Sequence, residues 1–245
     1  MSLPSSRRIL LTGASSGIGR ELARQLAREG HRLALLARRG ELLREVAAQV
    51  AGDRAGPGPV HAPVALPADV RDAEAVSAAV AAAEHSLGPL DTLIYSAGAA
   101  RFLAVEETTD AVWAEMLAAN LTGLFHCVRA CLPNFRARGC GHVVAILSVA
   151  SRQAFRGSSA YTAAKFGALG FIESLRDEVR RSGIHVTAVL PGATDTPIWD
   201  GLGPGWDRSK MMRPEQVARV VASSLRDTSS GMLEEIRLGP VGGNL

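Results

Sequence analysis

Short apolar segments alternate with segments of helical periodicity along the whole of this 245-residue chain. Most apolar segments are continuous, which is typical of parallel strands covered on both faces. We expect strands at Arg8–Thr12, Leu33–Ala37, His61–Leu66, Leu90–Ser96, His142–Ser148, His185–Leu190 and Leu233–Leu238. The period of 3.6 residues predicts helices at Ile18–Glu29, Glu41–Val50, Asp72–Ser86, Asp110–Arg138, Ser158–Arg181 and Pro214–Arg226. This alternation predicts an α/β fold with a doubly wound parallel sheet and helices on both faces.

The length supports a single domain over residues 1–245, because two ordinary domains with a linker need a longer chain. One segment breaks the alternation: residues 192–213 combine Pro and Gly with apolar side chains, including two of the three tryptophans. A loop this long in a compact domain is usually either a functional lid or disordered. We interpret residues 192–213 as a lid over a ligand site.

Composition argues against several classes of protein. The formal net charge is only +3 and the basic residues are scattered, whereas nucleic-acid binders concentrate them on one face. No apolar run reaches the ~18–20 residues that a membrane span requires. The apolar run after Arg7 and Arg8 stops at Thr12, which argues against a signal peptide.

The cysteines are few and odd in number, which predicts a reducing cytoplasmic location without disulfides. Cys127 and Cys131 have a spacing that zinc ligands can have, and His126 lies beside them. They fall in a predicted helix and no fourth ligand is evident, so we interpret them as buried helix residues and expect no metal.

A glycine-rich loop directly follows the first predicted strand and opens the first predicted helix. Its glycines allow a tight turn and close approach of a pyrophosphate, and the helix N-terminus supplies free N–H groups. The alternative is an ordinary glycine-rich turn, but the strand before it and the helix after it favour a dinucleotide. The residues we assign to this loop are Gly13, Ser15, Ser16, Gly17, Ile18 and Gly19.

The end of the second predicted strand indicates which dinucleotide binds. In dinucleotide folds a carboxylate here accepts the ribose 2′-OH, whereas an arginine pairs with a 2′-phosphate. The strand ends in Ala37-Arg38-Arg39, without a carboxylate. We therefore predict NADP(H), with NADPH preferred over NADH; the alternative is a solvated basic turn.

Tyr161 and Lys165 stand out because the chain has only two tyrosines and two lysines. Their spacing of four residues places both on one face of a predicted helix. A nearby ammonium favours the phenolate form of a tyrosine, and the planar arginine fork is a poor substitute for it. The pair therefore suits acid/base chemistry; the alternative is a helix-face tyrosine with a lysine that reaches solvent.

Ser148 ends the fifth predicted strand, at the sheet edge where ligands bind in this architecture. A serine here can also be a helix or turn cap, and Ser151 is a rival for the same role.

Taken together, Thr12–Gly19, Asn120, Ser148, Tyr161-Thr162-Ala163-Ala164-Lys165 and Pro191-Gly192 resemble the short-chain dehydrogenase/reductase family, in order and spacing. The resemblance implies a Rossmann fold with a seven-stranded parallel sheet, assembled as a homotetramer or homodimer. It implies that Tyr161 is the proton donor/acceptor, Ser148 orients the substrate carbonyl, and Lys165 holds the nicotinamide ribose and lowers the tyrosine pKa. Asn120 then kinks its helix and holds a proton-relay water near Lys165.

The resemblance also extends the expected cofactor site. Asp69 and Val70 match the pair that contacts adenine, and Thr196 matches the nicotinamide-carboxamide contact. The remaining residues expected to border the cofactor are Ala97, Gly98, Pro191, Gly192 and Thr194. One departure is Tyr95-Ser96-Ala97-Gly98, which stands where the family has Asn-Asn-Ala-Gly and leaves the usual side-chain bracing of the sheet an open question.

These residues predict an NADP(H)-dependent carbonyl reductase or alcohol dehydrogenase. The alternative is a catalytically idle member of the fold that binds a dinucleotide as a sensor or scaffold. The apolar side chains Trp199, Trp206, Met211 and Met212 favour a partly hydrophobic ketone or 3-oxoacyl substrate. An anionic substrate could be attracted by Arg101, Arg152 and Arg156.

Overall fold

The computed structural model describes residues 3–4, 6–52, 61–203, 205–226 and 231–243, so residue 204 of the expected lid lies outside the described residues. The described part contains one parallel sheet in the order β3-β2-β1-β4-β5-β6-β7. Its strands are β1 (Arg8–Thr12), β2 (Arg32–Ala37), β3 (Val64–Pro67), β4 (Thr92–Tyr95), β5 (Gly141–Ile146), β6 (Ile184–Pro191) and β7 (Glu235–Leu238). The predicted seven-stranded doubly wound sheet is confirmed. The strand order reverses between β1 and β4, where such sheets open a ligand crevice at the carboxyl ends of their strands.

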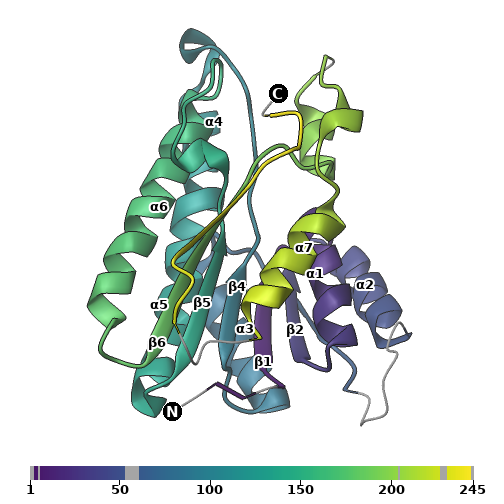
Figure 1. Ribbon diagram of the computed structural model, residues 1–245, viewed down its shortest axis with the longest axis vertical. Helices are drawn as coiled ribbons and strands as arrows, with labels where there is room; N and C mark the ends of the chain where they lie inside the picture. Colours follow the sequence, from purple (N-terminus) through teal and green to yellow (C-terminus); the bar gives the residue numbers. More distant parts are fainter. Residues whose placement is uncertain (1–2, 5, 53–60, 204, 227–230, 244–245) are drawn as a thin grey trace.

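Both faces of the sheet are buried, which explains why the strands are continuous apolar runs. In β1, Leu10 belongs to one core, and Ile9 and Leu11 belong to the other. The helices are α1 (Gly17–Arg28), α2 (Gly40–Gly52), α3 (Ala73–Leu87), α4 (Asp110–Leu117), α5 (Gly123–Arg138), α6 (Ser159–Val179) and α7 (Pro214–Ser224). Helices α1, α2 and α7 lie on one face of the sheet, and α3, α5 and α6 lie on the other (Figure 1). Their buried side chains form the two cores with the strands.

The predicted helix Asp110–Arg138 is interrupted. Between α4 and α5 the chain forms a π turn at Ala118–Thr122, and Asn120 lies in its middle. Asn120 Nδ2 donates to the Met116 carbonyl at 2.9 Å, so the side chain satisfies a helix carbonyl at this point. Single π turns inside helices are frequent at functional sites.

Among the described helices, Asp110–Arg138 alone has the length and composition to cross a membrane. Its α5 part buries Leu124, Cys127 and Phe135 completely in the core on the sheet. We therefore interpret it as a core helix.

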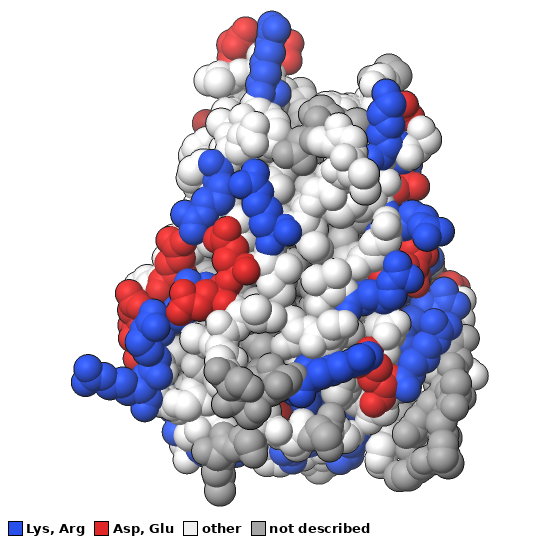
Figure 2. Space-filling view, in the orientation of Figure 1, with Lys and Arg blue, Asp and Glu red and all other residues white. Residues whose placement is uncertain are grey.

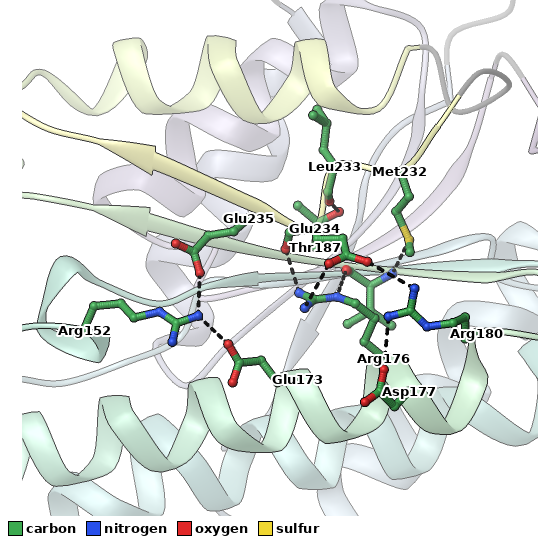
Figure 3. A network of polar contacts seen from close by, with 11 residues as sticks. Arg152, Glu173, Arg176, Asp177, Arg180, Thr187, Met232, Leu233, Glu234 and Glu235 are labelled. Atoms are coloured by element: carbon green, nitrogen blue, oxygen red, sulfur yellow. Dashed lines mark hydrogen bonds and ion pairs between the residues drawn. The ribbon is translucent and has the colours of Figure 1, made fainter.

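The edge strand β7 is fixed to the rest of the sheet by arginines (Figure 3). Arg176 of α6 is buried and donates to the carbonyls of Val186 and Glu234 at 3.1 and 2.6 Å. Arg180 also pairs with Glu234, at 3.4 Å. On the surface of the face shown in Figure 2, acidic and basic side chains are interspersed.

Candidate active site

A cleft of about 640 Å³ opens at the carboxyl edge of the sheet. Every residue that the sequence analysis assigned to the catalytic or cofactor site lines this cleft, although those residues span positions 13 to 196. They meet because the sheet is parallel, so that the segments after β1, β2, β3, β4, β5 and β6 emerge at one edge.

Two glycines of the loop after β1 are packed too closely against backbone to carry side chains. A Cβ on Gly13 would lie 2.6 Å from the Ser96 carbonyl oxygen, and one on Gly19 would lie 2.3 Å from the Gly13 oxygen. Gly13 and Gly17 also have φ angles of +66° and +54°, which favour glycine. The loop thus exposes bare backbone at the N-terminus of α1, an arrangement suited to phosphate.

Arginine side chains surround the phosphate end of the cleft. Arg39 Nη2 donates to Ser15 Oγ at 3.1 Å and to Ser16 Oγ at 2.8 Å, and Arg38 beside it is exposed and lines the cleft. Among the described lining residues the only carboxylate is Asp69, which pairs with Arg71 at 2.6 Å. Burial alone would raise the pKa of Asp69, but hydrogen bonds from Arg71 outweigh it and lower that pKa.

Asn120 connects its π turn to the loop after β4. Its Nδ2 donates to the Ala99 carbonyl at 2.9 Å, and its Oδ1 accepts from the Ala99 N–H at 3.4 Å. A Cβ on Gly98 would lie only 2.8 Å from Asn120 Oδ1 and 3.8 Å from Lys165 Nζ. Asn120, Gly98 and Lys165 are therefore in close proximity at the centre of the cleft.

Tyr161 and Lys165 lie on one face of α6, as their spacing predicted. Lys165 Nζ is 5.6 Å from the centroid of the Tyr161 ring. Lys165 is only 4% exposed, and this burial lowers its pKa to about 8. Burial raises the pKa of Tyr161, and a hydrogen bond with Ser148 acts in the opposite direction. The pKa of Tyr161 is therefore raised, whereas the resemblance implied that it is lowered. Burial of the phenol raises this pKa more than the hydrogen bond with Ser148 lowers it.

Ser148 lies just beyond β5, which ends at Ile146. Its Oγ accepts from the Ala150 N–H at 3.1 Å, so it caps a short 3₁₀ turn and lines the cleft at the same time. The rival Ser151 is buried, its hydroxyl has no hydrogen-bond partner in the described structure, and it is not among the lining residues. Ser148 is therefore the serine beside Tyr161.

An aromatic cluster from two distant segments lies beside Tyr161. Phe102 is in edge contact with Tyr161 at a centroid distance of 5.9 Å, and with Trp199 and Trp206 at 6.2 and 5.8 Å. The two tryptophans belong to the segment 192–213 and lie 5.0 Å apart. We call Phe102, Trp199 and Trp206 the aromatic wall.

Two expectations about the substrate end need correction. Met211 and Met212 are buried and are not among the lining residues; Met212 packs in the core with α1 and α7. Arg152 is engaged by Glu173 and Glu235 (Figure 3), and neither Arg152 nor Arg101 lines the cleft. Of the three arginines considered, Arg156 alone lines it.

Sequence reasoning missed Arg71, which lines the cleft, and Tyr95, which lies near it. Tyr95 was a departure from the family pattern, yet its hydroxyl donates to the Ala119 carbonyl at 2.6 Å, next to Asn120. The rarity of tyrosine was the available signal. Across the described residues, no three His, Cys, Asp or Glu side chains gather as a metal site.

Comparisons with known proteins show what this chain is similar to. A family model described as short chain dehydrogenase matches residues 7–205. A putative ketoacyl reductase of Streptomyces coelicolor is 34% identical, over 91% of each chain. The glycine betaine reductase ATRR of Emericella nidulans is also 34% identical; the match covers 96% of this chain but only 19% of that longer protein. An alcohol dehydrogenase from the archaeon Thermococcus sibiricus, solved with 5-hydroxy-NADP, superposes with a TM-score of 0.84 at 27% identity, over 95% of this chain and 96% of that one.

Proposed function

The chain belongs to the short-chain dehydrogenase family of oxidoreductases, and on that premise we propose that it transfers hydride between NADP(H) and a carbonyl or secondary alcohol, with Tyr161 as proton donor and acceptor. The observation that carries the proposal is the convergence of Asn120, Ser148, Tyr161 and Lys165 with a phosphate-binding loop in one cleft.

The residues present fit NADP(H). Gly13 and Gly19 leave no room for a Cβ, and Gly17 has a φ angle of +54°, so the loop turns tightly and the N-terminus of α1 would hold the pyrophosphate. Arg38 and Arg39 would pair with the 2′-phosphate, since no carboxylate ends β2. The Thermococcus sibiricus relative, solved with an NADP derivative, supports the same choice.

The cofactor's chemistry is to supply or accept the hydride when bound. In the direction of reduction, Tyr161 Oη donates its proton to the carbonyl oxygen as the carbon receives hydride. Burial raises the pKa of Tyr161, so the phenol is in the protonated form that reduction requires. Ser148 Oγ donates to the same oxygen and stabilises its developing negative charge. Lys165 then supports return of a proton to the phenolate, and its pKa of about 8 allows it to exchange protons near neutral pH.

The substrate we propose is a partly hydrophobic ketone or 3-oxoacyl compound. The aromatic wall provides an apolar surface next to Tyr161, and two of its three rings come from the segment 192–213, which we propose as the lid. The similarity to a putative ketoacyl reductase supports the same class.

The alternative is a catalytically idle dinucleotide-binding sensor or scaffold. The two are separated by following NADPH oxidation with a panel of aryl ketones, aldehydes and 3-oxoacyl thioesters. The proposal predicts carbonyl-dependent oxidation with equimolar alcohol product. Binding of NADPH by fluorescence without turnover on any member of the panel would favour the sensor.

A further inference from the structure

Tyr95 stands where the short-chain dehydrogenase pattern has an asparagine, and its side chain reaches the helix that carries Asn120. It is the last residue of β4 and is 1% exposed. Its hydroxyl donates to the carbonyl oxygen of Ala119 at 2.6 Å. Ala119 directly precedes Asn120 in the π turn, so this hydroxyl bonds the last residue of β4 to the turn.

The space for that hydroxyl is made by a glycine at the start of α5. A Cβ on Gly123 would lie 2.7 Å from Tyr95 Oη and 2.7 Å from Val70 Cγ2. Either contact is too short for a side chain, so Gly123 lets the phenol reach the helix backbone. Burial raises the pKa of Tyr95 well above its ordinary value, which keeps the hydroxyl protonated as a donor.

The π turn is thereby held from two sides. From within the helix, Asn120 Nδ2 donates to the Met116 carbonyl at 2.9 Å. From the sheet, Tyr95 donates to Ala119. A π turn is rare compared with continued α-helix. A hydrogen bond from outside the helix, such as that from Tyr95, therefore helps to stabilise the turn.

The turn sets the position of groups in the cleft. The Asn120 carboxamide bonds both backbone groups of Ala99 and lies against Gly98, which adjoins Lys165 Nζ. A shift of one residue in the helix would withdraw the carboxamide from this loop. The hydroxyl of Tyr95 is therefore connected to the reacting groups through Ala119 and Asn120.

We propose that Tyr95 is a positioning residue, which holds the π turn by its bond to Ala119 and so fixes Asn120 beside Lys165. Its hydroxyl links the end of β4 to the turn. Its catalytic consequence rests on the proposed function, whereas its effect on the turn does not.

The test is Tyr95→Phe, which removes the hydroxyl and keeps the ring. We expect kcat for carbonyl reduction to fall about tenfold while the NADPH Kd stays within about twofold. In an Asn120→Ala background the same change should alter kcat by less than about twofold, because the residue it positions is gone. Ser224→Ala is the matched control: it removes another buried hydroxyl that donates to a helix carbonyl, that of Val221 at 2.7 Å, in α7 away from the cleft.

Amide hydrogen exchange supplies a readout that needs no turnover. Tyr95→Phe should speed exchange over residues 116–123, and Ser224→Ala should not. Unchanged exchange there, an unchanged kcat, or a full tenfold loss that persists in the Asn120→Ala background would overturn the inference. If the wild-type chain turns over no carbonyl, the proposed function fails, and the exchange experiment still decides whether Tyr95 holds the turn.

Discussion

Arg38 and Arg39, at the end of β2, are the residues expected to decide which dinucleotide the cleft binds. The sequence predicted that they face a 2′-phosphate, and both line the cleft. Arg39 is bonded to Ser15 and Ser16 of the glycine loop, whereas Arg38 is exposed near Asp69. Arg38 is therefore the guanidinium with more freedom to pair with a phosphate, and Arg39 also orders the loop.

Arg38→Ala should weaken the preference for NADPH over NADH. Loss of a charge-assisted bond to the 2′-phosphate should reduce the NADPH/NADH ratio of kcat/KM about ten- to hundredfold, while NADH use changes little. Arg44→Ala, an exposed arginine of α2 that does not line the cleft, is the control. A wild-type ratio below one, or a ratio unmoved by Arg38→Ala, would leave Ala37-Arg38-Arg39 as a solvated turn.

The segment 192–213 shows how far an element can be predicted from composition. Its length and tryptophans predicted a lid. In the structure its ends meet where the Asp195 N–H donates to the Met212 carbonyl at 2.8 Å and the Met212 N–H donates to the Ala193 carbonyl at 2.9 Å. Arg208 also forms ion pairs with Asp195 and Asp200, at 2.5 and 2.7 Å, which hold the two halves of the segment together. The sequence could not reveal that Met212 turns inward, because an apolar residue in a loop serves a core or a pocket equally well.

The interrupted helix at Asp110–Arg138 was also beyond the reach of periodicity. The apolar pattern continues across Ala118–Thr122, so the pattern alone predicts one helix. Asn120 in the π turn donates to a helix carbonyl, and the turn accepts a bond from Tyr95, which lies in β4, 24 residues before Ala119. Only the family resemblance of Asn120 indicated a kink there.

Within the segment 192–213, Trp206→Ala should impair binding of bulky substrates. The ring is part of the aromatic wall, 5.8 Å from Phe102 and 5.0 Å from Trp199, so its loss should raise KM for aryl ketones about tenfold with little change in kcat. Trp113→Ala is the matched control, because that exposed tryptophan of α4 does not line the cleft. Equal effects of the two substitutions, or an effect of Trp206→Ala on kcat alone, would argue against the aromatic wall as substrate surface.

For the whole molecule, the alternation of strands and helices was enough to predict the sheet, since covered parallel strands leave a distinct apolar signature. It was not enough to predict strand ends: β5 ends at Ile146 and β7 begins at Glu235, where hydrogen bonding rather than hydropathy decides. The convergence of the site follows from the parallel sheet. The charge states of Tyr161 and Lys165 could not be predicted in the same way, because they depend on how deeply each side chain is buried.

Burial of Lys165 should make the stability of the cofactor-free protein depend on pH. Its pKa falls from 10.5 to about 8 on folding, so between these values the unfolded chain binds more protons. The free energy of unfolding should therefore gain up to about 3 kcal/mol from this group as pH rises from 8 to 10.5, and the cost is fully present below pH 8. Lys165→Met should lose that rise and be more stable at pH 7.

Urea unfolding of both proteins at pH 7 and pH 10 measures the effect. The buried thiols Cys127 and Cys131, whose pKa values are raised by burial, oppose the rise in both proteins, so the difference between the proteins isolates Lys165. If the free energy of unfolding depends on pH identically in the two proteins, the charged form of Lys165 does not destabilise the folded state.

The central claim is that hydride transfer in this cleft is coupled to proton transfer from Tyr161. Tyr161→Phe tests it most directly. The substitution removes only the hydroxyl, so NADPH should bind with a Kd within about threefold of wild type, measured by its fluorescence. Carbonyl-dependent NADPH oxidation should fall at least about hundredfold, because no other tyrosine lines the cleft to give the substrate its proton. A kcat that stays within about tenfold of wild type, a barrier change below about 1.4 kcal/mol, would contradict the assignment of Tyr161 as the acid.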